Sequence, residues 1–212
     1  MMLLGSHNSL SYLSPMKWYM IPFHFMAKCQ SVDYKTQYEK YGIRLFDIRL
    51  WFNEKGSLEV KHGLITFDID YQGVAEFLDF LNKKGDCYLR VILEEDNVSK
   101  NYPYAKESEM KFLQFCEQIE EAYKHIKFFG GNRKYDWLVI HRFKGKEPTL
   151  VDMYSSTTRF LGKRDDSNVF QKFLNIIDDW FPLLYALTWN KKNSNDFKEK
   201  DKFLFFDFVN IR

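Results

Sequence analysis

Two histidines stand where a predicted strand ends and a turn begins. His7 follows the segment M-M-L-L-G-S, and His62 lies in V-K-H-G-L, directly before Gly63. Imidazole has an unperturbed pKa of about 6.5, so it accepts or donates a proton near neutral pH. Two such groups at one site suit a reaction in which one deprotonates a hydroxyl and the other protonates a leaving group. The alternative is that both are ordinary turn residues.

Two charges interrupt the apolar segment G-I-R-L-F-D-I-R-L, residues 42–50. Alternation with period two places Phe46 and Ile48 on one face of the strand and Asp47 and Arg49 on the other. Charges that point into a closed strand layer are costly unless they are paired or used. Arg49 offers a planar, permanently charged fork for a phosphate. A structural ion pair between Asp47 and Arg49 is the alternative.

A single carboxylate, Asp207, lies in the apolar strand F-L-F-F-D-F-V-N, residues 203–210. An unpaired buried carboxylate is costly, so Asp207 needs a partner, and a histidine is the natural one. In a barrel the last strand lies beside the first, which would bring Asp207 to His7. The alternative is a carboxylate bonded to loop amides.

The elements that must position these groups alternate between short strands and amphipathic helices, which is typical of an α/β chain with mostly parallel strands. Apolar stripes predict helices from Val74 to a stop at Gly85, from Met110 to Tyr123, and from a cap at Asp166 or Ser167 to Ile177. The predicted strands are Met2–Ser6, Ile43–Leu50, Leu58–Lys61, Cys87–Leu93, Trp137–Arg142, Thr149–Met153, Leu184–Trp189 and Phe203–Val209.

Eight strands suggest a TIM-type (β/α)8 barrel, but a regular one needs about 250 residues. The connections after Lys61, Arg142 and Asn190 are too short for full barrel helices, and Asn190–Lys202 has the composition of a solvated loop. We therefore predict a distorted, incompletely closed barrel that forms a single domain over residues 1–212.

Composition excludes several classes of protein. The chain has 31 Lys and Arg against 29 Asp and Glu, a net charge of +2, whereas a dedicated nucleic-acid binder usually shows a strong basic excess. Three cysteines without metal-type spacing indicate neither a disulfide framework nor a zinc site. No apolar run is long enough to span a membrane, and the start lacks signal-peptide features. We expect a cytoplasmic protein or a secreted one whose leader has been removed.

Four motifs together resemble the catalytic motifs of bacterial phosphatidylinositol-specific phospholipase C, the X-domain fold. They are G-S-H-N-S, G-I-R-L-F-D-I-R, V-K-H-G and F-F-D-F-V, in the family's order and across essentially the whole chain. The resemblance implies a general base at His7, oriented by Asp207, with Arg49 neutralising the phosphate and His62 as the general acid. The implied products are diacylglycerol and inositol 1,2-cyclic phosphate, formed at a membrane surface without a cofactor.

Three further positions resemble the family's inositol pocket. Arg142, at the end of W-L-V-I-H-R, looks like the inositol-binding arginine, and Asp152 and Tyr154 in V-D-M-Y look like the family's D-x-Y pair. The acid would accept hydrogen bonds from inositol hydroxyls, and the ring would stack on the sugar. The alternative is an ordinary strand end followed by a loop.

Two departures from the family pattern concern the head group and the metal. Asn8 stands where bacterial members usually carry Asp and where the calcium-dependent animal branch carries Asn, and an acid, Asp96 with Glu94, stands near the family's inositol-contacting lysine. Asn8, Asp47 and these acids could supply oxygen ligands to calcium. Arg49 falls where the animal branch has a carboxylate ligand, so we expect no metal, with calcium as the alternative.

An aromatic segment follows His7, and it suits a lipid surface. Trp18, Tyr19 and Phe23, flanked by Lys17 and Lys28, would favour the bilayer boundary and anionic lipid. Core packing or a dimer contact is the alternative.

Two rival functions are a glycerophosphodiester phosphodiesterase and a catalytically weak lipid- or inositol-phosphate-binding module. The first family has a metal-binding Glu-x-Asp on its second strand, where this chain has Asp47-Ile48-Arg49. The second is favoured by Asn8, and turnover would distinguish it from an enzyme.

Overall fold

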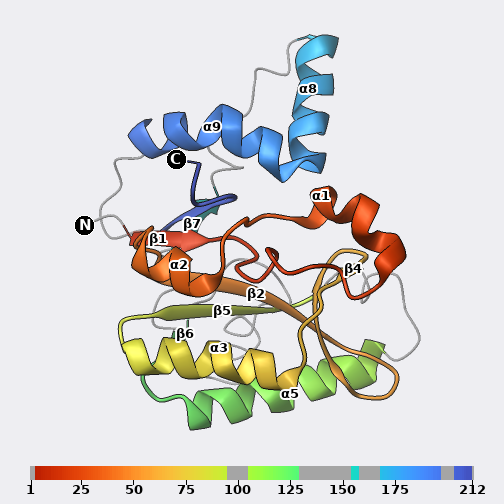
Figure 1. Cartoon of the computed structure of the whole chain (residues 1–212), viewed down its shortest axis with the longest axis vertical. Coiled ribbons are helices and arrows are strands. Elements are labelled where there is room, and N and C mark those ends of the chain that lie inside the picture. The colour runs from red at the N-terminus through yellow and green to blue at the C-terminus, as the bar shows by residue number, and fades with distance from the viewer. Residues whose placement is uncertain (1–2, 95–104, 129–153, 158–167, 197–202, 212) are drawn as a thin grey trace.

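A strongly curved, open sheet forms the centre of the molecule (Figure 1). The computed structural model describes residues 3–94, 105–128, 154–157, 168–196 and 203–211. Parallel strands run side by side in the order β7-β8-β1-β2-β5-β6. Their bounds are β1 Leu3–Ser6, β2 Leu45–Phe52, β5 Tyr88–Leu93, β6 Lys127–Phe128, β7 Tyr154–Thr157 and β8 Phe203–Phe206. The predicted incompletely closed barrel is confirmed.

Two further strands form an antiparallel extension at the end of β2. β3 (Leu58–His62) pairs with the last residues of β2, and β4 (Ile65–Thr66) pairs with β3. The connection from β2 to β3 is too short for a parallel crossover, which requires a dozen or more residues. The predicted strand Leu58–Lys61 therefore exists, but it does not belong to the parallel barrel.

Helices cover the sheet on two sides (Figure 1). α3 (Tyr71–Lys84) and α5 (Ala105–Ala122) lie side by side against β2 and β5, whereas α8 (Val169–Trp180) and α9 (Pro182–Asp196) lie at the opposite end of the molecule. The short helices η1 (Trp18–Phe23), α1 (His24–Ala27) and α2 (Tyr34–Glu39) fill the long connection from β1 to β2. α3 begins where Asp70 accepts a hydrogen bond from the Gly73 amide and ends at Gly85, which adopts a left-handed backbone.

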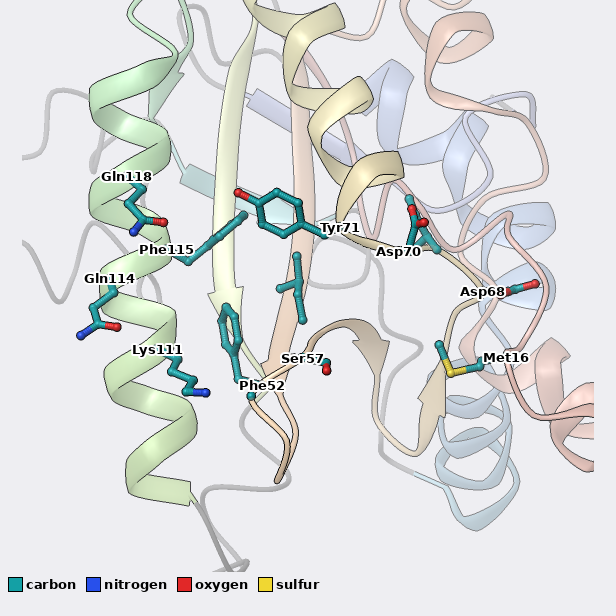
Figure 2. Close-up of a pocket in the computed structure, with 13 residues that line it drawn as sticks. Met16, Phe52, Ser57, Asp68, Asp70, Tyr71, Lys111, Gln114, Phe115 and Gln118 are labelled. Atoms are coloured by element: carbon teal, nitrogen blue, oxygen red, sulfur yellow. The ribbon is translucent and has the colours of Figure 1, made fainter.

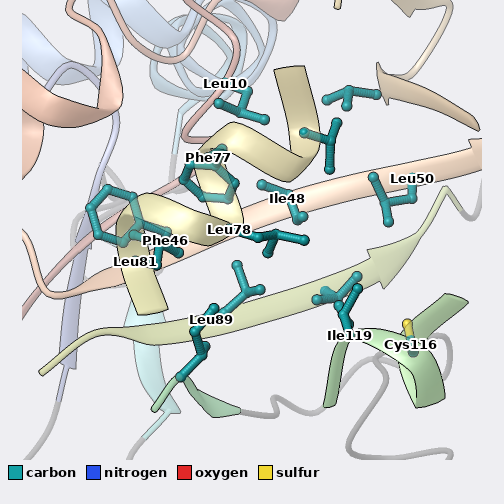
Figure 3. Packing of buried hydrophobic residues seen from close by; sticks show 14 of the residues in the cluster. Leu10, Phe46, Ile48, Leu50, Phe77, Leu78, Leu81, Leu89, Cys116 and Ile119 are labelled. Atoms are coloured by element: carbon teal, nitrogen blue, oxygen red, sulfur yellow. The ribbon is translucent and has the colours of Figure 1, made fainter. Parts of the chain in front are cut away.

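The main core lies between the sheet and the helices α3 and α5 (Figure 3). The predicted alternation in β2 is confirmed, because Phe46 and Ile48 enter this core while Asp47 and Arg49 lie on the other face. Burial of each large apolar side chain contributes about 1.5–3 kcal/mol. The core residues drawn in Figure 3 include Phe46, Ile48, Leu50, Phe77, Leu78, Leu81, Leu89, Cys116 and Ile119.

The prediction of a strand at Leu184–Trp189 is wrong, because these residues lie in the middle of α9. Pro182 takes the first helical position, where its missing N–H costs nothing. Tyr185, Ala186 and Trp189 are buried with helical spacing. The helix continues to Asp196, so the first half of the predicted loop Asn190–Lys202 is helical as well.

The remaining differences are local. Asn168 caps α8 by accepting a hydrogen bond from the Gln171 amide, so neither Asp166 nor Ser167 is the cap. β4, β6 and β7 are too short for sequence periodicity to reveal. The predicted strands Trp137–Arg142 and Thr149–Met153 lie outside the described residues. Within the described part of the chain, no helix combines the length and hydropathy needed to cross a bilayer.

Candidate active site

His7 and Asp207 meet because their strands are parallel neighbours. β1 and β8 pair with Ser6 opposite Phe206, so each of the two residues directly follows a paired position. The His7 amide donates to the Phe206 carbonyl at 3.0 Å, and His7 Nδ1 lies 2.8 Å from Asp207 Oδ1. Both side chains are buried. The predicted carboxylate–imidazole pair is present.

Arg49 determines which nitrogen of His7 carries the proton. Its Nη2 lies 3.0 Å from His7 Nε2, and a guanidinium has donors only, so Nε2 must accept. The proton of the neutral ring is therefore on Nδ1, from which it is donated to Asp207. Burial lowers the pKa of His7, and Arg49 lowers it further, while Asp207 opposes both effects. His7 is thus a neutral imidazole whose Nε2 lone pair accepts the hydrogen bond from Arg49.

Asp47 approaches the same nitrogen without pairing with Arg49. Its Oδ2 lies 3.8 Å from His7 Nε2 and accepts a long hydrogen bond, 3.4 Å, from the Asn8 amide. No ion pair joins Asp47 to Arg49 in the described part of the chain, so the purely structural alternative is not supported. Asp47 Oδ1 and Arg49 Nε are buried without hydrogen-bond partners. Such orphaned buried atoms are rare and often mark a functional site.

His62 faces His7 from the antiparallel extension. The two rings lie at right angles, with their centroids 6.0 Å apart. His62 Nδ1 lies 2.9 Å from the Ala27 carbonyl, which can only accept, so Nδ1 carries a proton. In the cationic ring Nε2 carries the second proton and can act as an acid. The two predicted histidines are therefore brought together, although His62 does not come from a parallel strand.

Asn8 connects to His62 through a sulfur atom that the sequence did not single out. Asn8 adopts a left-handed backbone, which Asn tolerates better than most residues. Its Nδ2 lies 3.6 Å from Cys29 Sγ, and that sulfur lies 3.8 Å from His62 Nδ1. Cys29 is fully buried, and a lone cysteine in a sequence gives no signal of such a position. Asn8 does belong to this cluster, but its contact with His62 is indirect.

Metal-binding atoms are present, but their proton arrangement does not suit a cation. Atoms of His7, Cys29 and Asp207 lie within 4.8 Å of one another. A metal on Nδ1 of His7 would move the ring proton to Nε2, where it would face the Arg49 donors. A calcium ion beside Asp47 would likewise meet the Arg49 guanidinium, and the two positive centres would repel in a buried site.

The other predicted site residues are less central or lie outside the described part. Glu94, at the end of β5, is buried and accepts a hydrogen bond from the Gly63 amide at 3.2 Å, which ties it to the turn after His62. Tyr154 begins β7 opposite Phe203. Arg142, Asp152 and Asp96 lie outside the described residues.

The aromatic segment is exposed rather than packed. Trp18 is 80% exposed, and Tyr19 and Phe23 are each at least half exposed, so core packing is wrong for these three side chains. Phe25, in α1, stacks on Phe181 at a centroid distance of 5.3 Å, which joins this segment to the start of α9. α8 and α9 present further exposed apolar side chains, namely Val169, Phe170, Phe173, Ile176, Trp180 and Leu187.

A separate cavity lies between α5, the β2–β3 turn and the start of α3 (Figure 2). It has a volume of about 600 Å³, and Phe52, Tyr71 and Phe115 line it together with Asp68 and Lys111. None of the predicted site residues in the described part of the chain lines it. The candidate active site is the cluster around the two histidines, because the groups capable of proton transfer gather there.

Comparison with known proteins supports the fold. No family model matches the sequence, and no curated protein sequence matches it significantly. Among solved structures, the phosphatidylinositol-specific phospholipase C from Listeria monocytogenes is similar, with a TM-score of 0.53 and 17% identity over 97% of this chain and 87% of that one. A mutant of the phosphatidylinositol-specific phospholipase C from Staphylococcus aureus gives a TM-score of 0.53 and 16% identity over 97% of this chain and 84% of that one. This chain therefore has the fold of bacterial phosphatidylinositol-specific phospholipase C.

The contact between Asp207 and His7 predicts a change in titration. Asp207 raises the pKa of His7, so Asp207→Asn should lower that pKa below its value in the parent protein. NMR titration of the histidine ring protons measures the change, and His24, whose ring nitrogen contacts the Ser11 carbonyl, serves as an internal reference. An unchanged His7 pKa in the variant would contradict the assigned pairing.

Proposed function

We propose that this chain is a lyase of the phosphatidylinositol-specific phospholipase C type. It would cleave phosphatidylinositol or a glycosylated derivative to diacylglycerol and inositol 1,2-cyclic phosphate, without a metal. The observation that carries this proposal is the chain of contacts from Asp207 through His7 to Arg49, with His62 facing His7 at 6.0 Å. An internal phosphoryl transfer requires a base, an acid and a permanently charged cationic group close to one another.

The first step follows from the contact between Arg49 and His7 Nε2. A phosphodiester carries a negative charge and accepts hydrogen bonds, so it would draw the guanidinium from Nε2 onto its non-bridging oxygens. This movement frees the lone pair of Nε2 for the inositol 2-hydroxyl. Substrate binding would thereby activate the base, and Arg49 would neutralise the phosphate in the same movement.

Bond making and proton transfer then balance within the site. His7 Nε2 takes the proton of the 2-hydroxyl, and the oxygen forms a bond to phosphorus. The bond from phosphorus to the diacylglycerol oxygen breaks, and that oxygen takes the proton from Nε2 of cationic His62. Asp207 stabilises the imidazolium that forms at His7. Water can later open the cyclic phosphate with the two histidines in reversed roles.

We further propose that the exposed aromatic segment contacts the lipid surface. Trp18, Tyr19 and Phe23 lie in the connection from β1 to β2, which begins with His7. Lys17 Nζ lies over the Tyr19 ring, 5.9 Å from its centroid. Aromatic rings with adjacent lysines favour the boundary of an anionic bilayer. The stack of Phe25 on Phe181 makes this surface continuous with the apolar faces of α8 and α9.

Two histidine variants test the proposed division of roles. His7→Ala and His62→Ala should each slow diacylglycerol release from phosphatidylinositol vesicles by about 100-fold or more, which is the usual scale for the loss of a general acid or base. With a soluble inositol phosphodiester that carries a nitrophenol leaving group, His62→Ala should recover most of its rate. Such a leaving group departs without a proton, so only the base remains essential.

His125→Ala is the matched control, because this histidine is exposed and its backbone amide donates to Asn82 Oδ1. It should cleave both substrates at the parental rate. Equal recovery of His7→Ala and His62→Ala on the activated substrate would remove the base-and-acid assignment. Near-parental rates of either variant on phosphatidylinositol would remove that residue from the mechanism.

The proposed lipid contact predicts that a substitution can weaken vesicle binding without slowing substrate cleavage. Trp18→Ala should weaken sedimentation with vesicles of phosphatidylcholine and phosphatidylinositol, yet leave cleavage of the soluble substrate within about twofold, because Trp18 contacts lipid and not the reacting atoms. Met110→Ala removes an exposed apolar side chain from α5 and should leave both properties intact. Equal vesicle affinity of Trp18→Ala and the parent protein would refute the contact.

A further inference from the structure

Gln30 makes three hydrogen bonds that join the ends of β1 and β8, which His7 and Asp207 directly follow. Its Nε2 donates to the carbonyls of His7 at 3.0 Å and Phe206 at 2.8 Å. Its Oε1 accepts from the Val209 amide at 3.1 Å. The side chain is fully buried. All three bonds go to the backbone on either side of the contact between His7 and Asp207.

The polarity of these bonds is specific to an amide side chain. Two carbonyls require a group with two donors, and the Val209 amide requires an acceptor at the other position. Glutamate would place a negative oxygen against two carbonyls. An apolar side chain would remove the Gln30 donor from the His7 carbonyl and the Gln30 acceptor from the Val209 amide, and it would leave the Phe206 carbonyl with only the His7 amide. Gln30 thus supplies the two donors and the one acceptor that these three backbone groups require.

The backbone of Gln30 is itself held by the loop that follows His7. Ser11 Oγ accepts from the amides of Cys29 at 2.9 Å and Gln30 at 3.0 Å. On the same short segment, the Ala27 carbonyl accepts from His62 Nδ1. Residues 27–30 therefore contact His62 at one end and the backbone beside His7 and Asp207 at the other.

We propose that Gln30 is the positioning residue that sets the geometry between His7 and Asp207. It touches neither the substrate nor the reacting atoms, and it acts by fixing the backbone from which both side chains extend. The part of this proposal that concerns rate rests on the proposed lyase function. Displacement of a catalytic group by about 1 Å can cost about 100-fold in rate, so loss of this brace should act on turnover more than on substrate binding.

The test replaces Gln30 by Met, which keeps the length of the side chain but removes the three bonds. Gln37→Met is the matched control. Gln37 is also fully buried, and its Nε2 also donates to two carbonyls, those of Ser9 and Val32, both at 2.8 Å. The measurements are kcat and KM on phosphatidylinositol vesicles, the NMR signal of the His7 Nδ1 proton, and the thermal midpoint.

Gln30→Met should lower kcat about 10- to 100-fold with KM changed less than about threefold, and it should shift or broaden the Nδ1 proton signal. Gln37→Met should lower the thermal midpoint to a similar degree yet leave kcat and the signal unchanged. Parental kcat and signal in Gln30→Met, or equal losses in both variants, would reduce Gln30 to an ordinary structural residue.

Two arrangements keep the test decisive. If Gln30→Met does not fold, Gln30→Asn retains an amide with both donors and the acceptor but is one methylene shorter, so it should loosen the same three bonds and shift the His7 signal. If the parent protein releases no diacylglycerol, the proposed function fails, but the Nδ1 proton signal still shows whether Gln30 sets the pairing of His7 with Asp207. The two failures are therefore distinguishable.

Discussion

The site depends on one line of hydrogen bonds that runs from Asp207 through the His7 ring to Arg49. Arg49 can only donate and Asp207 accepts, so the ring between them is fixed in a single tautomer. Three strands must be adjacent for this line to exist, because Asp207 follows β8, His7 follows β1 and Arg49 lies on β2. The parallel order β8-β1-β2 supplies this adjacency through backbone pairing alone. The order of strands thus determines which nitrogen of the neutral His7 ring carries the proton.

The interior of the barrel bears the energetic cost of this arrangement. Asp47, Arg49, Arg90, Glu94 and Asp207 are all buried, while the apolar core lies on the opposite face of β2 against α3 and α5. Buried charges seldom add stability over well-packed apolar residues, so a cluster of them indicates a role in function. Asp47 and Arg49 each retain a buried polar atom without a partner. A phosphodiester ringed by hydroxyls would complement both atoms, since it brings acceptors to Arg49 and donors to Asp47.

The parts of this account that the sequence predicted are those that depend on local pattern. Alternation in β2 placed Asp47 and Arg49 on one face, and the rule that the last strand of a barrel lies beside the first placed Asp207 near His7. Gln30 could not be found in this way, because it reaches Phe206 across 176 positions and its own neighbourhood carries no periodic signal. Cys29 was hidden for the same reason. The segment Leu184–Trp189 misled because an apolar run of six residues fits either a strand or a buried helix face.

The central claim is that these residues drive attack by a hydroxyl of the substrate itself, and the identity of the first product tests it most directly. Mixed phospholipid vesicles containing phosphatidylinositol should be incubated with the protein in excess chelator and followed by 31P NMR. The account predicts that a cyclic inositol phosphodiester signal appears first, together with diacylglycerol, while the other phospholipids remain intact. Direct formation of an acyclic phosphate, or no product until a divalent metal is restored, would contradict it.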